Sequence, residues 1–171
     1  QPGRCGYAHF LDHDGRIIDD MIFAVSSESE VLGVPNSTMV GIMFQWLSDQ
    51  LPSDGSITFL DVSDKTSIIA LQGPLSGKVI SEVIGFENAV GVFRCQEIGH
   101  NELGISGWIQ GTGYTGEAGV EIFVSNEQAP ILWDALYAHP SSTPVGLGAR
   151  DTLRMEKGYL LSGQDFLWPG I

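Results

Sequence analysis

The chain has 171 residues, which is enough for one domain with a sizeable core or for two small ones. Twenty-one acidic side chains against eight basic ones give a net charge of -13 at pH 7, which would repel a phosphate backbone and argues against nucleic acid as a partner. No apolar run approaches the ~20 residues that span a bilayer, so we expect no membrane partner either.

The first elements are predicted to be three short strands. Residues 7–11 and 17–25 are rich in β-forming side chains, and residues 12–15 between them end in Asp-Gly, a strong turn signal. We therefore predict a β-hairpin. A third run, residues 30–34, stops at Pro35, which has no N–H to donate to a ladder.

An amphipathic helix is predicted after this sheet, capped by Asn36 or Ser37 and ended by residues 52–55. Its apolar side chains recur at three- and four-residue spacing. They are Met39, Val40, Met43, Trp46, Leu47 and Leu51. Residues 57–60 and 67–71 have the composition of strands.

The second half of the chain is predicted to alternate helices with strands around glycine-rich turns. The predicted elements are a helix that opens at Gly73-Pro74, strands at 108–110 and 120–124, a helix at 127–137 capped by Asn126, and a helix at 145–157 between Pro144 and Gly158. Strands outnumber helices and connect through tight turns, so the sequence predicts an α+β fold with mixed or antiparallel sheets and packed helices. A break in composition near residues 85–91 indicates a boundary between two parts.

The segment GTGYTG satisfies the dinucleotide-binding pattern GxGxxG, which needs a helix at its end. The residues that follow alternate apolar and polar from Val120 to Ser125, which is the period of a strand. The glycines therefore indicate a tight hairpin that a flat ligand can approach closely, flanked by Tyr114 and Glu121. The alternative is an ordinary glycine-rich turn with a solvated glutamate.

Two neighbouring acids, Asp19 and Asp20, lie inside an apolar strand. Strand alternation sends adjacent side chains to opposite faces, so one carboxylate is expected to face inward or into a cleft. The alternative is an edge strand on which both acids are solvated.

Other polar residues give weaker signals. Arg150, Asp151 and Arg154 have the helical spacing of a surface ion-pair ladder. The four histidines show no metal-ligand spacing, so no metal site is predicted. Cys5 and Cys95 lie outside any CxxC pattern, which favours a reducing compartment over a disulfide framework.

Five segments stand out when the chain is taken in order: GRIIDDMI, VPNSTM, IALQGP, GTGYTGEAGVEIFV and GLGARDTLRMEKGYLLSGQD. Together they resemble the T-protein of the glycine cleavage system, the tetrahydrofolate-dependent aminomethyltransferase. Their order and spacing match from Tyr7 to Asp165. By the layout of that family, residues 1–85 would be a middle α+β domain with the Asp-Asp strand, and residues 86–171 the second part of the folate-binding first domain.

This resemblance implies an enzyme that moves an aminomethyl carbon from the lipoyl arm of H-protein to tetrahydrofolate, a co-substrate, with release of ammonia. It implies a cytoplasmic protein, or a mitochondrial one in a eukaryote. Family positions place Asp20 beside the reacting folate nitrogens as the catalytic group. The folate-binding positions fall on Asn36, Tyr114, Glu121 and Arg150, with Tyr7 as a further candidate.

The chain departs from the family pattern in two respects. Gly15-Arg16 stands where the family has Gly-Gly, and family members carry further sequence on both sides of the five segments. We therefore expect an incomplete version of the T-protein fold and less than full activity from 171 residues alone.

Three alternatives remain open. Relatives of this fold use tetrahydrofolate to accept methyl groups from sulfonium compounds or aryl ethers, and others are folate domains of dimethylglycine- or sarcosine-oxidising enzymes. The third alternative is a non-enzymatic folate-binding iron–sulfur assembly factor. Those factors carry a cysteine in a KGCYxGQE motif, and the sequence from Lys157 to Asp165 has no thiol.

Overall fold

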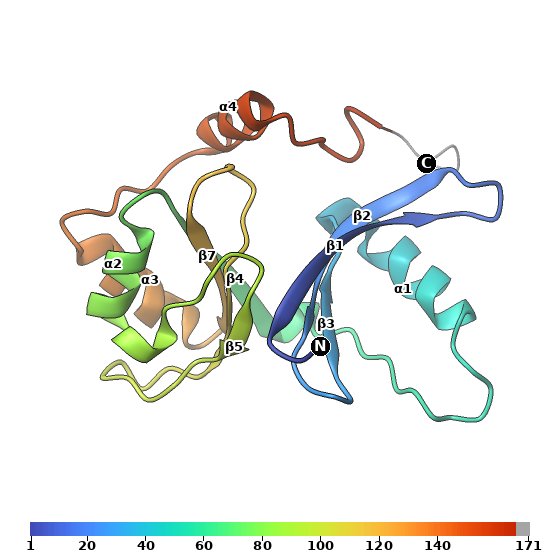
Figure 1. Cartoon of the computed structure of the whole chain (residues 1–171), viewed down its shortest axis with the longest axis horizontal. Coiled ribbons are helices and arrows are strands. Elements are labelled where there is room, and N and C mark those ends of the chain that lie inside the picture. The colour runs from blue at the N-terminus through green and yellow to red at the C-terminus, as the bar shows by residue number, and fades with distance from the viewer. Residues whose placement is uncertain (167–171) are drawn as a thin grey trace.

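A computed structural model describes residues 1–166, so the last five residues of the expected second part lie outside the described residues. The described residues form two antiparallel sheets that stand side by side, with the last helix and the residues after it extending above both (Figure 1). This arrangement confirms the predicted α+β class.

The first sheet contains the predicted hairpin and third strand in the order β1-β2-β3. These strands are β1 (Arg4–Leu11), β2 (Ile17–Val25) and β3 (Val31–Val34). Gly15 takes a φ of 81° in the turn, and the Asp12 carboxylate accepts the backbone N–H groups of Asp14 and Arg16 at 2.9 and 2.8 Å. Arg16 therefore fits this turn in place of a second glycine.

Helix α1 (Val40–Asp49) follows a short 3-10 turn, η1 (Ser37–Met39), and packs on the first sheet. The buried side chains between them are Ile18, Met21, Met39 and Met43. The strand predicted at residues 57–60 is wrong, because this segment has no strand partner in the described structure. One of its side chains, Phe59, stacks instead on Phe44 of α1, with ring centroids 4.9 Å apart.

The second sheet has the strand order β4-β7-β6-β5. Its strands are β4 (Thr66–Gln72), β5 (Cys95–Glu97), β6 (Gly107–Gln110) and β7 (Gly119–Ser125). Helices α2 (Ser76–Val83) and α3 (Ala129–Ala138) contribute side chains to the core on one face. That core contains Val79, Ile80, Ile84, Ile105, Ile109, Val120, Ile122, Val124, Leu132 and Leu136. The sequence predicted these elements except β5.

The predicted cap of α3 is wrong. The helix begins at Ala129, and the Asn126 side chain lies too early to cap it. Asn126 instead accepts the Ser67 hydroxyl at 2.8 Å and donates to the Asp64 carbonyl at 2.8 Å. This side chain therefore fastens the start of β4 to the end of β7.

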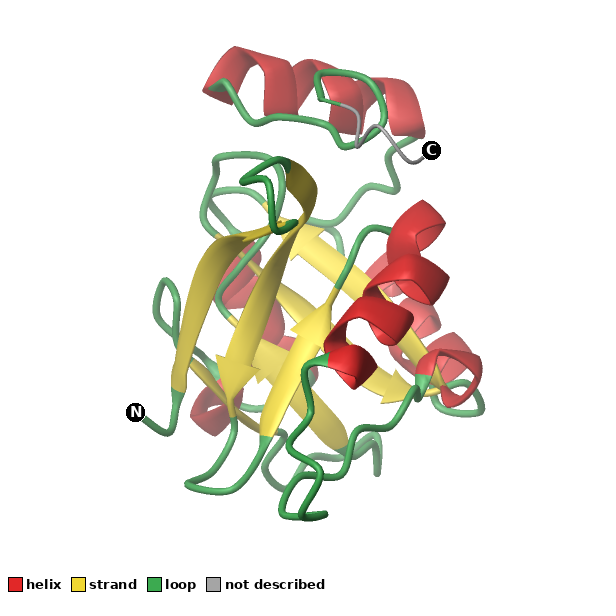
Figure 2. Cartoon of the chain, turned by 90° about the vertical axis from the view of Figure 1, so that its right-hand side faces the viewer, coloured by secondary structure: helices red, strands yellow, loops and turns green. Residues whose placement is uncertain are grey.

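The two sheets are joined edge to edge and face to face. The backbone of Cys5 donates to Phe93 at 2.9 Å, and that of Cys95 donates to Gly3 at 3.2 Å, which links β1 to the start of β5. Buried Ala24, Cys95 and Trp108 pack together between the two sheets, which lie one behind the other in Figure 2. The expected division at residue 85 stays a prediction; β4 and α2, which precede it, belong to the second sheet and its core.

Helix α4 (Leu147–Lys157) ends at Gly158, whose φ of 80° is left-handed, as its predicted place just past the helix requires. The helix and the residues after it cross above both sheets (Figure 1). Among the described residues, no helix has the length and apolar character needed to span a membrane.

Candidate functional site

The two acids of β2 occupy different environments, as strand alternation predicts. The Asp19 side chain is fully buried, whereas Asp20 is half-buried on the opposite face. The alternative of two solvated acids on an edge is wrong, because β2 is the central strand of its sheet. Only Asp20 is open to a ligand from the space between the sheets.

Asn36 ties the two carboxylates together. Its backbone N–H donates to Asp19 Oδ2 at 3.1 Å, and its side-chain amide donates to Asp19 Oδ1 at 2.7 Å and to Asp20 Oδ1 at 2.8 Å. It makes no side-chain cap to the following turn. The predicted capping role of Asn36 is therefore wrong, and the amide instead orients the carboxylates.

The other Asp20 oxygen is held from β1. Tyr7 Oη donates to Asp20 Oδ2 at 2.7 Å, and His9 Nε2 lies 3.3 Å from the same hydroxyl. Partial burial of the ring, together with the hydrogen bond to Asp20, raises the pKa of Tyr7 above its ordinary value. The phenol thus stays protonated and remains a donor at neutral pH. The sequence singled out Tyr7 but missed the part of His9.

Glu121 lies on β7, opposite Gln110 of β6, on the face that looks toward the first sheet. The Thr112 hydroxyl donates to Glu121 Oε2 at 2.5 Å, and the Gln110 amide lies 3.4 Å from the same oxygen. Within residues 1–166, Oε2 is the oxygen that accepts both of these hydrogen bonds, so Oε1 can accept from a ligand. The solvated-glutamate alternative does not fit a half-buried, oriented carboxylate.

The sequence did not single out Gln110 or Thr112, the two hydrogen-bond partners of Glu121. Gln110 is 2% exposed and Thr112 is 6% exposed. The sequence offers one local signal, which is at Gln110. This polar residue follows the apolar pair Trp108-Ile109, and strand alternation turns its side chain away from the core. The link of Gln110 and Thr112 to Glu121 follows from strand pairing, which a single sequence does not reveal.

The glycine-rich segment forms the predicted turn between β6 and β7, and a side chain of the protein fills it. Gln72, the last residue of β4, donates to the carbonyls of Thr112 at 3.1 Å and Val120 at 3.0 Å. A Cβ on Gly113 would lie 2.0 Å from Gln72 Oε1, and one on Gly119 would lie 2.3 Å from it. These two glycines therefore make room for Gln72 rather than for a ligand.

This packing predicts a measurable coupling between Gln72 and Gly113. Gly113→Ala would expel an anchored amide and lose two hydrogen bonds, so we expect the free energy of unfolding to fall by about 2 kcal/mol. In a Gln72→Ala background the same change removes only backbone freedom from the unfolded chain and should stabilise by ~0.5 kcal/mol. A double-mutant cycle in urea measures the difference; additive effects would contradict the packing.

An aromatic and cationic cluster covers the turn from above. The Arg150 guanidinium lies 4.7 Å from the Tyr114 ring centroid, and Tyr114 stacks on Tyr159 with centroids 6.0 Å apart. The Tyr114 hydroxyl also donates to the Leu160 carbonyl. Tyr114 therefore joins the glycine-rich turn to α4 and the residues after it.

The side chain that joins α4 to the residues after it is Arg154, which is 3% exposed. It donates to Asp151 at 2.8 Å, to the Tyr159 carbonyl at 3.0 Å, and to Asp165. The predicted pairing of Arg154 with Asp151 is confirmed, but this ion pair is not part of a surface ladder, because its arginine is buried.

Site residues of the two sheets face a common space. Burial is the main cause of the raised pKa of Tyr114, and the negative charge of Asp20 adds to it from the other sheet. Burial likewise raises the pKa of Cys5 to about 12, and Glu121 contributes to that shift. Tyr114 therefore lies close enough to Asp20 of the first sheet, and Glu121 close enough to Cys5, for their charges to interact.

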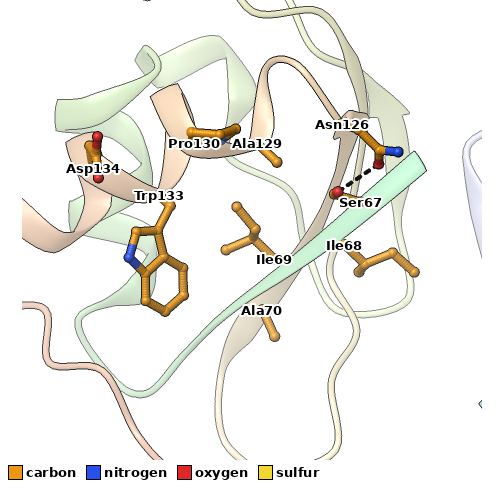
Figure 3. A pocket seen from close by; sticks show the side chains of 9 residues that line it. All are labelled: Ser67, Ile68, Ile69, Ala70, Asn126, Ala129, Pro130, Trp133 and Asp134. Atoms are coloured by element: carbon orange, nitrogen blue, oxygen red, sulfur yellow. Dashed lines mark hydrogen bonds between the residues drawn. The ribbon is translucent and has the colours of Figure 1, made fainter. Parts of the chain in front are cut away.

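A separate hollow of about 560 Å³ lies between β4 and α3 (Figure 3). Trp133 and Ile69 face it from the helix and the strand. None of the residues that line it is an expected site residue. Across residues 1–166, no group of three or more His, Cys, Asp or Glu side chains is placed to hold a metal ion.

Comparisons with known proteins agree on one family. The family described as "GCVT N-terminal domain" matches residues 1–167. Proteins named aminomethyltransferase are 37% identical in Pelodictyon phaeoclathratiforme, over 96% of this chain and 46% of that protein, and 39% identical in Chlorobaculum parvum, over 95% and 46%. The crystal structure of glycine cleavage system aminomethyltransferase T from Bartonella henselae superposes with a TM-score of 0.82 at 28% identity, covering 96% of this chain and 44% of that one. The chain thus spans less than half the length of the relatives it matches.

Proposed function

The chain belongs to the GCVT N-terminal domain family, and from this membership we propose that it acts in a tetrahydrofolate-dependent aminomethyltransferase of glycine cleavage. The aminomethyl carbon would come from lipoylated H-protein and pass to tetrahydrofolate with release of ammonia. The reaction would take place in the cytoplasm, or in the mitochondrion of a eukaryote.

The observation that carries the proposal is the pair of oriented carboxylates, Asp20 and Glu121, on the facing sides of the two sheets. Glu121 offers an open oxygen beside buried donors, and a pterin presents adjacent N–H donors on one edge that such a carboxylate can accept. On this proposal Tyr114 packs on the pterin ring.

Positive charge is scarce on this protein, and its placement supports the same ligand. The sequence contains only eight lysines and arginines, yet one of them, Arg150, lies exposed over the Tyr114 ring. The glutamate tail of a folate carries carboxylates, for which a guanidinium is a strong partner. We propose that Arg150 binds this tail and that Asn36 contributes to the pterin site.

Asp20 is proposed to serve the chemistry. Bridging one carbon between two folate nitrogens removes an N–H proton from each, while the sulfur and the amino group that leave each gain one. A carboxylate beside the folate nitrogens can accept such a proton and stabilise the positive charge that develops there. Asn36 and Tyr7 each donate to one Asp20 oxygen, which fixes its orientation.

The test is an assay of ammonia release from aminomethylated H-protein with and without tetrahydrofolate, on the 171-residue chain and on the whole gene product. We expect folate-dependent release by the whole product. Methyl transfer from a sulfonium or aryl ether donor in its place would assign the protein to another branch of the fold. Folate binding without any turnover would support a non-enzymatic role and contradict the proposed reaction.

A further inference from the structure

Three side chains on the inner face of the first sheet form a continuous polar chain. The register of β1 and β2 sets His9 directly opposite Asp20, and Tyr7 lies two residues along β1 on the same face. Tyr7 Oη is 2.7 Å from Asp20 Oδ2 and 3.3 Å from His9 Nε2. The Tyr7 and His9 rings meet edge to face with centroids 5.2 Å apart.

The polar chain of Asp20, Tyr7 and His9 runs from the candidate site to the solvent. Asp20 is half-buried, and its Oδ1 is occupied by Asn36. Tyr7 is 48% exposed, and His9 is exposed at the far end. A folate bound in the gap would cover Asp20 further, which would leave Tyr7 as its route to water.

We propose that His9 exchanges protons between Asp20 and solvent through the Tyr7 hydroxyl during turnover. This inference rests on the proposed function, because it takes Asp20 as the group that accepts a folate N–H proton. Histidine suits the outer end of such a chain, since its charge ordinarily changes between pH 5 and 8. His9 acts through Tyr7 and does not touch the folate.

The proton transfer balances without any further reactant. The Oδ2–H bond of protonated Asp20 breaks as an O–H bond forms on Tyr7, and the proton that Tyr7 carried moves to Nε2 of His9. The imidazolium then loses its Nδ1 proton to water. Asp20 returns to a carboxylate, Tyr7 remains a phenol, and rotation of the Tyr7 hydroxyl together with imidazole exchange restores the starting state.

Other ionisable groups, on the elements that face this polar chain, affect the pKa values of its members. Asp20 and Asp19 of β2 and Tyr114 of the glycine-rich turn each contribute to the raised pKa of Tyr7. Arg150, Arg154 and Asp165 act on Tyr114 in turn. The observed pH profile will therefore belong to the group as a whole, and variants are needed to separate the part of His9.

The test compares kcat against pH for wild type, His9→Gln, Tyr7→Phe and the double variant. We expect each single change to lower kcat by about 100-fold, the low end of proton-transfer effects. The double variant should be no slower than the slower single one, since both changes break one path. Free imidazole should restore part of the activity of His9→Ala, because His9 is exposed. His13→Gln, in the exposed turn of the same hairpin, is the matched control and should keep wild-type turnover.

Unchanged kcat in His9→Gln, or additive losses in the double variant, would overturn the relay. Tetrahydrofolate affinity separates this result from failure of the proposed function, since affinity should be unchanged in His9→Gln. If the wild type turns over no donor, proton NMR still decides. The Tyr7 hydroxyl resonance should shift in His9→Gln and broaden in Asp20→Asn. An unchanged Tyr7 resonance in His9→Gln would refute the contact between Tyr7 and His9.

Discussion

Replacing Glu121 by alanine is expected to lower the affinity for tetrahydrofolate by about 100-fold. Hydrogen bonds to a charged group contribute ~1.5–3 kcal/mol each. The loss of two such bonds to the pterin edge therefore corresponds to about 3 kcal/mol, with each 1.4 kcal/mol giving a factor of ten. Fluorescence or calorimetric titration of the 171-residue chain measures the change directly.

The structure supplies a matched control for this experiment. Glu117 is an exposed glutamate in the same glycine-rich turn, and Glu117→Ala removes the same charge from the protein without touching Thr112 or Gln110. We expect Glu117→Ala to bind tetrahydrofolate within about twofold of wild type, since exposed charges contribute little. Undiminished binding by Glu121→Ala would remove Glu121 from the site, and equal losses in both variants would indicate a general charge effect.

The parts of the fold that could be predicted from the sequence are those encoded by neighbouring residues. The Asp-Gly turn before Arg16 and the alternation of β2 gave the hairpin, and three- and four-residue spacing gave α1. The strand β5 could not be predicted in this way, because Cys95 to Glu97 is a strand only through its pairing with β6. The predicted strand at residues 57–60 has β-forming side chains, but its Phe59 ring is used in stacking on α1.

The site shows the same limit. Alternation alone separated Asp19 from Asp20, and the strand after the glycines excluded a nucleotide-binding loop. Contacts between distant residues could not be predicted, because the positions of Gln72 inside the glycine-rich turn, Thr112 on Glu121 and His9 opposite Asp20 all depend on how the strands pair. The glycine spacing correctly indicated that another group lies close to the backbone of the turn. At Gly113 this group is the Gln72 side chain and not a ligand.

The two acids of β2 provide a test in which neighbouring residues should fail in different ways. Asp20→Asn is expected to lower kcat about 100-fold, the low end of the effect of losing an acid or base. Stability should change little, because an amide at this half-buried position can still accept from Asn36 and donate to Tyr7. Steady-state kinetics at saturating folate, together with urea unfolding, separates the two effects.

Asp19→Asn should give the opposite result. Both Asp19 oxygens accept from Asn36 in a fully buried position, and an amide offers only one acceptor oxygen, so one donor would face an NH₂ group. We expect a loss of about 1–3 kcal/mol in the free energy of unfolding with kcat largely retained in the folded fraction. A stable Asp19→Asn protein without turnover, beside an active Asp20→Asn protein, would exchange the two roles. Such a result would place the chemistry on the buried acid, out of contact with the relay through Tyr7.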